Sequence, residues 1–217
     1  MENHGNSFQK VLMAVLVAAV LWFLMFSPWT APKLNFWLAM TVSACVLMTM
    51  ALPDVMRGGE LSVRNVELGD VVREVLYGIA IAVALWGVFW VGDKVSGLMF
   101  DFARPQVESI YGMKADGEAW VIGLLLLCLI GPAEELFWRG YVQRNLTTRW
   151  GANAAFVATT LVYALVHVWS MNFMLVMAAL TCGVCWGGLY RLCPKHLPAI
   201  VLSHALWDAA VFVWVPI

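Results

Sequence analysis

Charged side chains are scarce in this sequence of 217 residues. Only 12% of the residues are Asp, Glu, Lys or Arg, which is about half the share found in an average soluble domain. The net charge is −1, so the chain lacks the basic excess that nucleic-acid-binding proteins use. These two features exclude an ordinary soluble domain and a nucleic-acid partner bound through a basic surface.

Apolar residues take the place of the missing charges. Hydrophobic residues make up 62% of the sequence, and the mean hydropathy is +0.80. The chain also holds twelve tryptophans, a residue that is enriched where a membrane meets water. The composition therefore predicts a protein that crosses a lipid bilayer several times.

The N-terminus lacks the features of a cleavable signal peptide. The acidic Glu2 precedes Lys10, and no small-residue cleavage site follows the apolar run at 11–26. We therefore expect a retained first transmembrane helix. Organelle-targeting features are also missing, which favours the plasma or inner membrane of a prokaryotic cell.

Long linkers, low-complexity tracts and internal repeats are missing too. A membrane span needs about 20 mostly apolar residues. The candidate spans are 8–27, 34–53, 71–92, 119–140, 152–170, 172–190 and 197–216. The sequence thus predicts an all-α polytopic bundle of about seven transmembrane helices, built as one integral membrane domain over residues 1–217.

Two connections between these spans hold most of the polarity. Residues 54–70 are expected to form a polar loop. Residues 93–118 mix apolar and charged side chains, which suits a segment lying along the membrane surface. An eighth, short membrane helix in 93–118 is the alternative.

Lysine and arginine are distributed unevenly between the two ends of the predicted helices. Positive residues favour cytoplasmic loops, and the uneven distribution predicts a cytoplasmic N-terminus and an external C-terminus. In this orientation the cytoplasmic side holds Lys10, Arg57, Arg64, Arg73, Arg144, Arg149, Arg191 and Lys195, and the outer side holds Lys33, Lys94, Arg104 and Lys114.

Small residues and cysteines in the apolar runs are expected to serve packing. Gly183 and Gly187 are spaced as G-x-x-x-G, which predicts a close helix-packing face within the bundle, with a dimer interface as the alternative.

Cysteines in the apolar runs are expected to be small buried hydrophobes, although the C-x-x-C spacing also leaves a metal or redox role open. They are Cys45, Cys128, Cys182 and Cys185; Cys193 lies outside these runs.

Three ionisable residues stand inside the fourth predicted span. A charge within a bilayer costs at least about 2.5–3.5 kcal/mol, so such residues are usually paired and face the bundle interior. Arg139 follows Glu135 by four residues, which makes the two side chains neighbours on a helix. The Glu134 side chain points about 100° around the helix from that of Glu135. It needs a partner from another segment, or it must carry a proton.

Gly131 and Pro132 precede the two glutamates. Proline cannot donate to the helix ladder, so the Cys128 carbonyl loses its hydrogen bond. We expect the helix to kink or restart here, with Pro132 in a first turn and Glu134 near a positive helix end.

Two further polar pairs occupy other spans at helical spacing. Tyr163 and His167 are four residues apart, as are His204 and Asp208. With Glu134 they could converge on one point, where a carboxylate beside an imidazole can take a proton from water. A second histidine can donate to a developing oxyanion. Because no serine, cysteine or threonine is set up as a nucleophile, this pattern favours hydrolysis by an activated water.

Structural roles are the competing interpretation for each pair alone. A histidine inside a membrane commonly makes an interhelical hydrogen bond, Glu135 and Arg139 neutralise one another in any case, and Tyr163 can serve packing. The joint occurrence of all three pairs favours chemistry, because packing alone is met by glycine, alanine and leucine.

The same residues resemble a known family. The resemblance is carried by EELFWR at 134–139, YALVH at 163–167 and HALWD at 204–208. Their order on successive helices is similar to that of the CPBP family of intramembrane proteases, the CAAX-protease and bacteriocin-processing group that includes the Ras-converting endoprotease. The resemblance covers about residues 119–216.

This resemblance implies a glutamate-dependent endopeptidase that needs no metal or other cofactor and acts on a membrane-anchored protein or peptide. Glu134 would be the general base on water, assisted by His167. His204 and Asp208 would hold the oxyanion or the substrate carbonyl. The implied supporting residues are Glu135, Arg139 and Tyr163.

The sequence departs from the family pattern at two positions. Tyr163 replaces the commoner phenylalanine. Asp208 stands where the Ras-converting relatives have asparagine, and an ionised aspartate can only accept, so it would orient His204 or donate when protonated. The predicted span boundaries also place His167 roughly 10 Å too far along its helix to meet Glu134.

Two other functions remain open. The first is a membrane immunity factor or scaffold that keeps the fold without catalysis. The second is a metal site or a proton-coupled transporter, because Glu, His and Asp are plausible zinc ligands. The sequence has neither an H-E-x-x-H motif nor the inverted repeat of many transporters.

Overall fold

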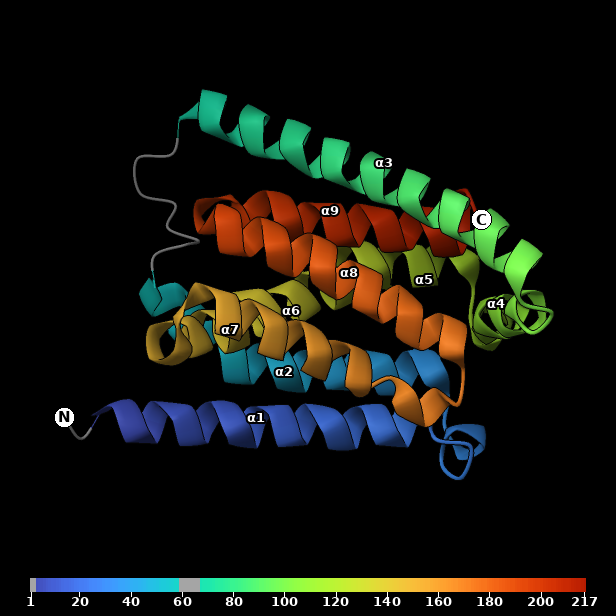
Figure 1. Cartoon of the computed structure of the whole chain (residues 1–217), viewed down its shortest axis with the longest axis horizontal. Helices are drawn as coiled ribbons and strands as arrows, with labels where there is room; N and C mark the ends of the chain where they lie inside the picture. Colours follow the sequence, from blue (N-terminus) through green and yellow to red (C-terminus); the bar gives the residue numbers. More distant parts are fainter. Residues whose placement is uncertain (1–2, 59–66) are drawn as a thin grey trace.

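A computed structural model describes residues 3–58 and 67–217, and this part of the chain is helical and contains no strand. Figure 1 shows the long helices running side by side in one bundle. The helices are α1 (Asn3–Phe26), α2 (Phe36–Gly58), α3 (Leu68–Met99), α4 (Ala103–Gly112), α5 (Ala119–Leu125), α6 (Gly131–Glu135), α7 (Arg144–Leu165), α8 (Phe173–Leu192) and α9 (Leu197–Ala209). The predicted all-α bundle is confirmed, whereas its extent as one domain stays a prediction.

Six helical runs in the described ranges are long and apolar enough to cross a membrane. The longest, residues 119–170, contains two predicted spans and has 52 residues. A straight helix of that length would extend about 78 Å, but Gly151 interrupts it with a φ of 79°. Glycine adopts this left-handed geometry without steric cost, and Figure 1 shows the chain turning back along α7. The six runs therefore give the predicted seven membrane spans only when this run is divided at Gly151.

The two polar connections differ from expectation. α3 extends to Met99, well past the predicted end at residue 92, and α4 has only 10 residues. At about 1.5 Å per residue α4 is too short to span a membrane, so the eighth-span alternative is wrong. It lies across one end of the bundle (Figure 1). Helices α2 and α3 extend into the expected loop at 54–70, whose residues 59–66, with Arg64, lie outside the described part.

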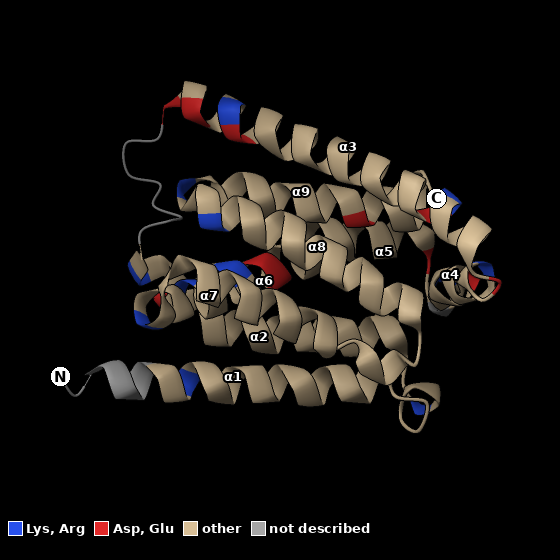
Figure 2. Cartoon of the chain, in the orientation of Figure 1, with Lys and Arg blue, Asp and Glu red and all other residues tan. Residues whose placement is uncertain are grey.

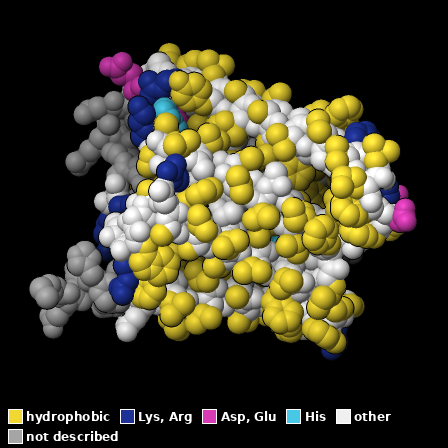
Figure 3. All heavy atoms as spheres, viewed as in Figure 1, with side chains coloured by type: hydrophobic (Ala, Val, Ile, Leu, Met, Phe, Trp, Pro, Cys, Tyr) yellow, Lys and Arg dark blue, Asp and Glu magenta, His cyan; other side chains and the backbone are white. Residues whose placement is uncertain are grey.

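The outer surface of the bundle is apolar. Large hydrophobic side chains such as Met13, Leu38 and Val83 are at least 60% exposed, and Figure 3 shows them covering the long sides of the helices. Lys and Arg gather mainly at the end where α1 begins (Figure 2). An apolar belt of this extent needs a lipid environment, and the chain is a multi-pass membrane protein.

The helix through Pro132 is continuous, so the expected restart is wrong, whereas the expected kink stays a prediction. The segment Leu126–Ile130 is π-helical, and the Gly131 N–H donates to the carbonyl of Leu126, five residues back. A second π-helical segment spans Leu136–Gln143. These wider turns absorb the missing donor of Pro132 without a restart. Glu134 consequently lies in the middle of a helical run, and its predicted place at a positive helix end is wrong.

Gly131 brings α6 close to α9. A Cβ at this position would lie 2.8 Å from the Ala205 Cα and 2.9 Å from its backbone nitrogen, atoms that cannot rotate away. This contact sets the distance between the helix that carries Glu134 and the helix that carries His204.

We expect Gly131→Ala to lower the free energy of unfolding by about 1–3 kcal/mol, because the methyl group forces two packed backbones apart. The measurement is thermal unfolding in detergent, followed by the loss of monodisperse protein on heating. The matched control is Gly87→Ala, where a Cβ meets nothing within 4 Å. Equal stability of the two variants would show that the α6–α9 contact is not tight.

The small residues of α8 behave largely as predicted. A Cβ at Gly183 would lie 3.1 Å from Thr160, and one at Gly187 would lie 3.2 Å from Gln143, so this face packs inside the bundle.

The cysteines follow their expectation only in part. Cys182 is buried, but Cys45 and Cys128 lie on the exposed apolar surface, because the faces of their helices that carry them have no protein neighbour.

Candidate active site

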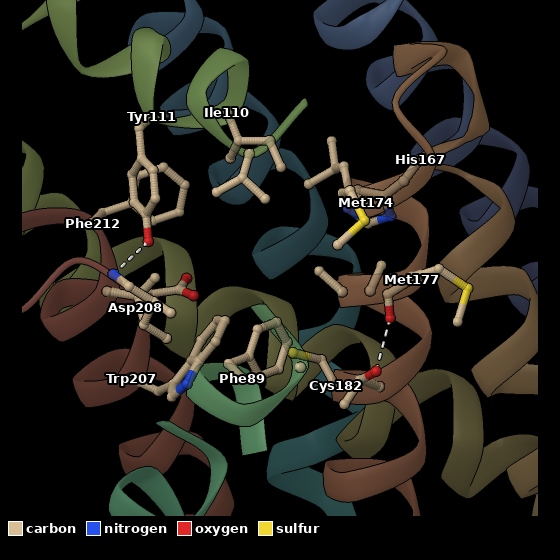
Figure 4. A pocket seen from close by; sticks show the side chains of 18 of the residues that line it. Phe89, Ile110, Tyr111, His167, Met174, Met177, Cys182, Trp207, Asp208 and Phe212 are labelled. Carbon is tan, nitrogen blue, oxygen red and sulfur yellow. Dashed lines mark hydrogen bonds between the residues drawn. The ribbon is translucent and has the colours of Figure 1, made fainter. Parts of the chain in front are cut away.

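A cavity of about 420 Å³ opens beside α4 and extends to the middle of the bundle. Figure 3 shows the hollow in the surface, and Figure 4 shows its walls, with His167 and Asp208 on opposite sides. Most of its lining is apolar and aromatic. The predicted site residues among the lining are Glu134, Tyr163, His167, His204 and Asp208. Glu135 and Arg139 lie behind this wall with no exposed surface.

Glu134 is 5% exposed and borders the cavity. The Tyr163 hydroxyl donates to its Oε2 at 3.2 Å. In the described ranges no ion pair involves Glu134. The partner that Glu134 needs from another segment is therefore a neutral hydroxyl, supplied by the residue that replaces the commoner phenylalanine.

Glu135 joins two helices. Its Oε1 accepts from the Arg139 Nη1 at 2.7 Å, as the helical spacing predicted, and from the His204 Nδ1 on α9, also at 2.7 Å. Arg139 stacks over the Tyr163 ring, with its Cζ 4.8 Å from the ring centroid. Glu135 therefore ties α9 to the helix that carries Glu134.

His204 lies between two carboxylates. Its Nε2 is 3.2 Å from the Asp208 Oδ2, while its Nδ1 faces Glu135. If both carboxylates are ionised, each ring nitrogen must carry a proton, so the ring is an imidazolium. Asp208, 13% exposed at its side chain, thus orients His204, which is one of the two roles open to an aspartate at this position.

When His204 is protonated, the charges of Glu135, Arg139, His204 and Asp208 sum to zero. Glu134 is not part of this sum. Arg139 and a protonated His204 carry two positive charges, and Glu135 and Asp208 carry two negative ones. Burying matched charges close together limits the desolvation penalty that isolated charges would incur. Glu134 is the carboxylate left outside this balance, and like Asp208 it borders the cavity.

His167 lies just beyond the end of α7 and does not contact Glu134 directly. The Trp22 indole N–H donates to its Nε2 at 3.0 Å, and its Nδ1 is 2.8 Å from the Tyr163 carbonyl oxygen. Because Nε2 accepts, the proton of a neutral ring sits on Nδ1. Tyr163 contacts both residues: its carbonyl oxygen and ring contact His167, and its hydroxyl donates to Glu134.

Two tryptophans of the site could not be recognised from the sequence. Trp186 stacks on His204, with ring centroids 3.9 Å apart and planes at 18°. Trp22 of α1 holds the tautomer of His167. Neither lies in a motif with the polar pairs, and in a chain with twelve tryptophans their position carries no signal.

Metal binding has little support in this geometry. Within residues 3–58 and 67–217, no three His, Cys, Asp or Glu side chains are grouped so that they could hold a metal ion. The site instead pairs its histidines with carboxylates, an indole and a carbonyl.

Comparison with known proteins covers the C-terminal half of the bundle. Residues 116–210 match the family model described as type II CAAX prenyl endopeptidase Rce1-like. No curated protein and no solved structure matches the chain significantly. The match includes all the predicted site residues and leaves out α1 to α4.

Proposed function

We propose that this chain is an intramembrane endopeptidase of the glutamate type, because residues 116–210 match the family model described as type II CAAX prenyl endopeptidase Rce1-like. It hydrolyses a peptide bond near the end of a membrane-associated protein or peptide. One observation supports this most: Glu134 is a buried carboxylate that forms no ion pair within the described ranges and lies at the wall of an apolar cavity. Such a group can take a proton from water in a place that excludes bulk solvent.

The proposed reaction begins with a water held by Glu134. Its oxygen attacks the substrate carbonyl carbon while Glu134 accepts the proton, and the carbonyl oxygen becomes an oxyanion. In this proposal the Nε2–H of His204 is transferred from its contact with Asp208 to a hydrogen bond with that oxyanion, while Glu135 holds the ring through Nδ1–H. Glu134 then gives its proton to the leaving nitrogen, the C–N bond breaks, and the products are a carboxylic acid and an amine.

His167 assists Glu134 through Tyr163 in this proposal. Its Nδ1–H donates to the Tyr163 carbonyl oxygen, and the Tyr163 hydroxyl donates to Glu134. With both ring nitrogens engaged, His167 is a positioning residue, and Trp22 is the group that keeps it so. This revises the direct assistance that the family resemblance implied.

The proposed setting is the plasma or inner membrane, with the N-terminus in the cytoplasm. The concentration of Lys and Arg at the end where α1 begins supports this orientation (Figure 2). The partners are the lipid bilayer and a membrane-anchored protein or peptide substrate. A non-catalytic immunity or scaffold protein of the same fold is the alternative, and it predicts binding without cleavage.

Cleavage in membranes tests the proposal. Candidate membrane-anchored tails are incubated with vesicles that contain the purified chain or none, and substrate length is read by mass spectrometry. We expect shortened products only with the chain, and we expect a metal chelator to change the rate by less than about twofold, because protein groups alone balance the site. Loss of cleavage in chelator would favour the metal-site alternative. Intact substrate that copurifies with the chain would favour the scaffold.

A further inference from the structure

The segment after α9 reaches the cavity through Ile217. Helical geometry ends at Trp214, and Val215 has φ −139° and ψ 68°. Val215 is 51% exposed, whereas Ile217 is half-buried, lines the cavity and packs against the apolar core. Residues 215–217 therefore form a short non-helical peptide whose Ile217 lines the same cavity that Glu134 borders.

Two side chains from different helices hold the backbone of this segment. The Trp86 indole of α3 donates to the Val215 carbonyl oxygen at 3.1 Å. The Ile217 N–H donates to the Tyr111 hydroxyl of α4 at 3.0 Å, the contact drawn at Tyr111 in Figure 4. The Val215 N–H donates to the Ala210 carbonyl oxygen, and Pro216 has no N–H. No N–H of residues 215–217 is thus left unsatisfied beside the apolar wall, where an unpaired one would be costly.

A substrate peptide faces the same requirement. In a helix its peptide groups are bonded to one another, so a bond that is to be cleaved must first leave the helix. Its backbone N–H and C=O groups then need new partners inside an apolar cavity. Tyr111, which lines the cavity, offers a hydroxyl that can accept or donate, and Trp86, outside the cavity lining, offers a donor to the backbone of the same segment.

We propose that Trp86 and Tyr111 form a subsite for the backbone of an extended apolar peptide, which residues 215–217 occupy until a substrate segment takes their place. This rests on the proposed function and adds to it the form in which the substrate binds. The apolar pocket around Ile217 selects a bulky aliphatic side chain at that position. Both subsite residues lie outside 116–210, so the family match carries no information about them.

Two features fit Tyr111 to this role. Its ring packs on Phe212, with centroids 6.0 Å apart, which fixes the hydroxyl at the mouth of the cavity. Burial raises the pKa of Tyr111 above its ordinary value, so the hydroxyl stays neutral at physiological pH.

The test uses photo-crosslinking of a peptide to the purified full chain in detergent. The probe is acetyl-Trp-Val-Pro-Ile with a photoreactive diazirine in the isoleucine side chain, and the crosslinked fraction is read from the intact mass. Ile217→Pro removes the N–H that binds Tyr111, so the internal segment competes less. We expect crosslinking to rise about threefold to tenfold, the effect of one hydrogen bond.

A second substitution identifies the subsite. Tyr111→Phe added to Ile217→Pro is expected to cancel that gain, because the probe loses the same hydroxyl. The matched control adds Tyr77→Phe instead, a tyrosine on α3 that does not line the cavity, and the gain should persist. No gain with Ile217→Pro, or the same gain with Tyr111→Phe added, would overturn the subsite.

Crosslinking requires no hydrolysis, so the two proposals can fail separately. A chain that cleaves substrates but lacks this crosslinking pattern removes the subsite and keeps the peptidase. A chain that has the pattern but cleaves no tail keeps the peptide-binding subsite and removes the peptidase.

Discussion

Glu134→Gln is expected to lower kcat for substrate cleavage by about two to four orders of magnitude, the contribution of a general base. The amide has the same size and keeps an oxygen that can accept from Tyr163, but it cannot take a proton from water. KM should change little, because the shape of the cavity is preserved. Initial rates of product formation in vesicles, quantified by mass spectrometry, give both constants.

The control for this substitution is Glu118→Gln. Glu118 is exposed at the start of α5 and makes no side-chain capping bond, so its loss should leave kcat unchanged. Thermal unfolding of Glu134→Gln should remain close to that of the unsubstituted chain. A rate within tenfold of the original would remove Glu134 from the chemistry, and the activated-water mechanism with it.

Arg139→Met is expected to lower the free energy of unfolding by about 3–5 kcal/mol, the cost of leaving a buried charge without its partner. Arg139 and Glu135 are both 0% exposed, and their ion pair is 2.7 Å long. Methionine fills much of the same volume but provides no donor, so Glu135 would keep His204 alone. The measurement is thermal unfolding in detergent at matched protein concentration.

Two further variants separate charge from packing. Glu135→Gln combined with Arg139→Met removes both charges and leaves His204 paired with Asp208, so more than half of the lost stability should return. Arg73→Met breaks the half-exposed pair with Asp70 and should cost less than about 1 kcal/mol. A cost for Arg139→Met as small as that for Arg73→Met would contradict a structural role for the buried pair.

The polar pairs of the site were predictable where they lie within one helix. Glu135 and Arg139, like His204 and Asp208, are four residues apart, and helical geometry alone makes such residues neighbours. The all-α membrane fold followed in the same way from the length and hydropathy of the apolar runs. The restart expected at Pro132 was wrong, because local reasoning does not include the π-helical turns that keep the helix continuous there.

Contacts between helices needed the tertiary structure. The sequence left Glu134 without a partner, and only the packing of α7 beside it supplies the Tyr163 hydroxyl. The bond from Glu135 to His204 joins residues 69 positions apart, and the bond from Trp22 to His167 joins residues 145 apart. No helical periodicity relates such positions, because their distance depends on how whole helices pack.

The sequence by itself therefore determined that this is a helical membrane protein with paired ionisable groups inside its spans, since hydropathy and the 3.6-residue repeat are local properties. Only the tertiary structure decided which carboxylate borders the cavity outside the ion pairs of the described residues, how His167 is held, and that Ile217 lines the cavity. Those arrangements arise from the packing of separate helices, where close approaches such as Gly131 against Ala205 fix the register of the site.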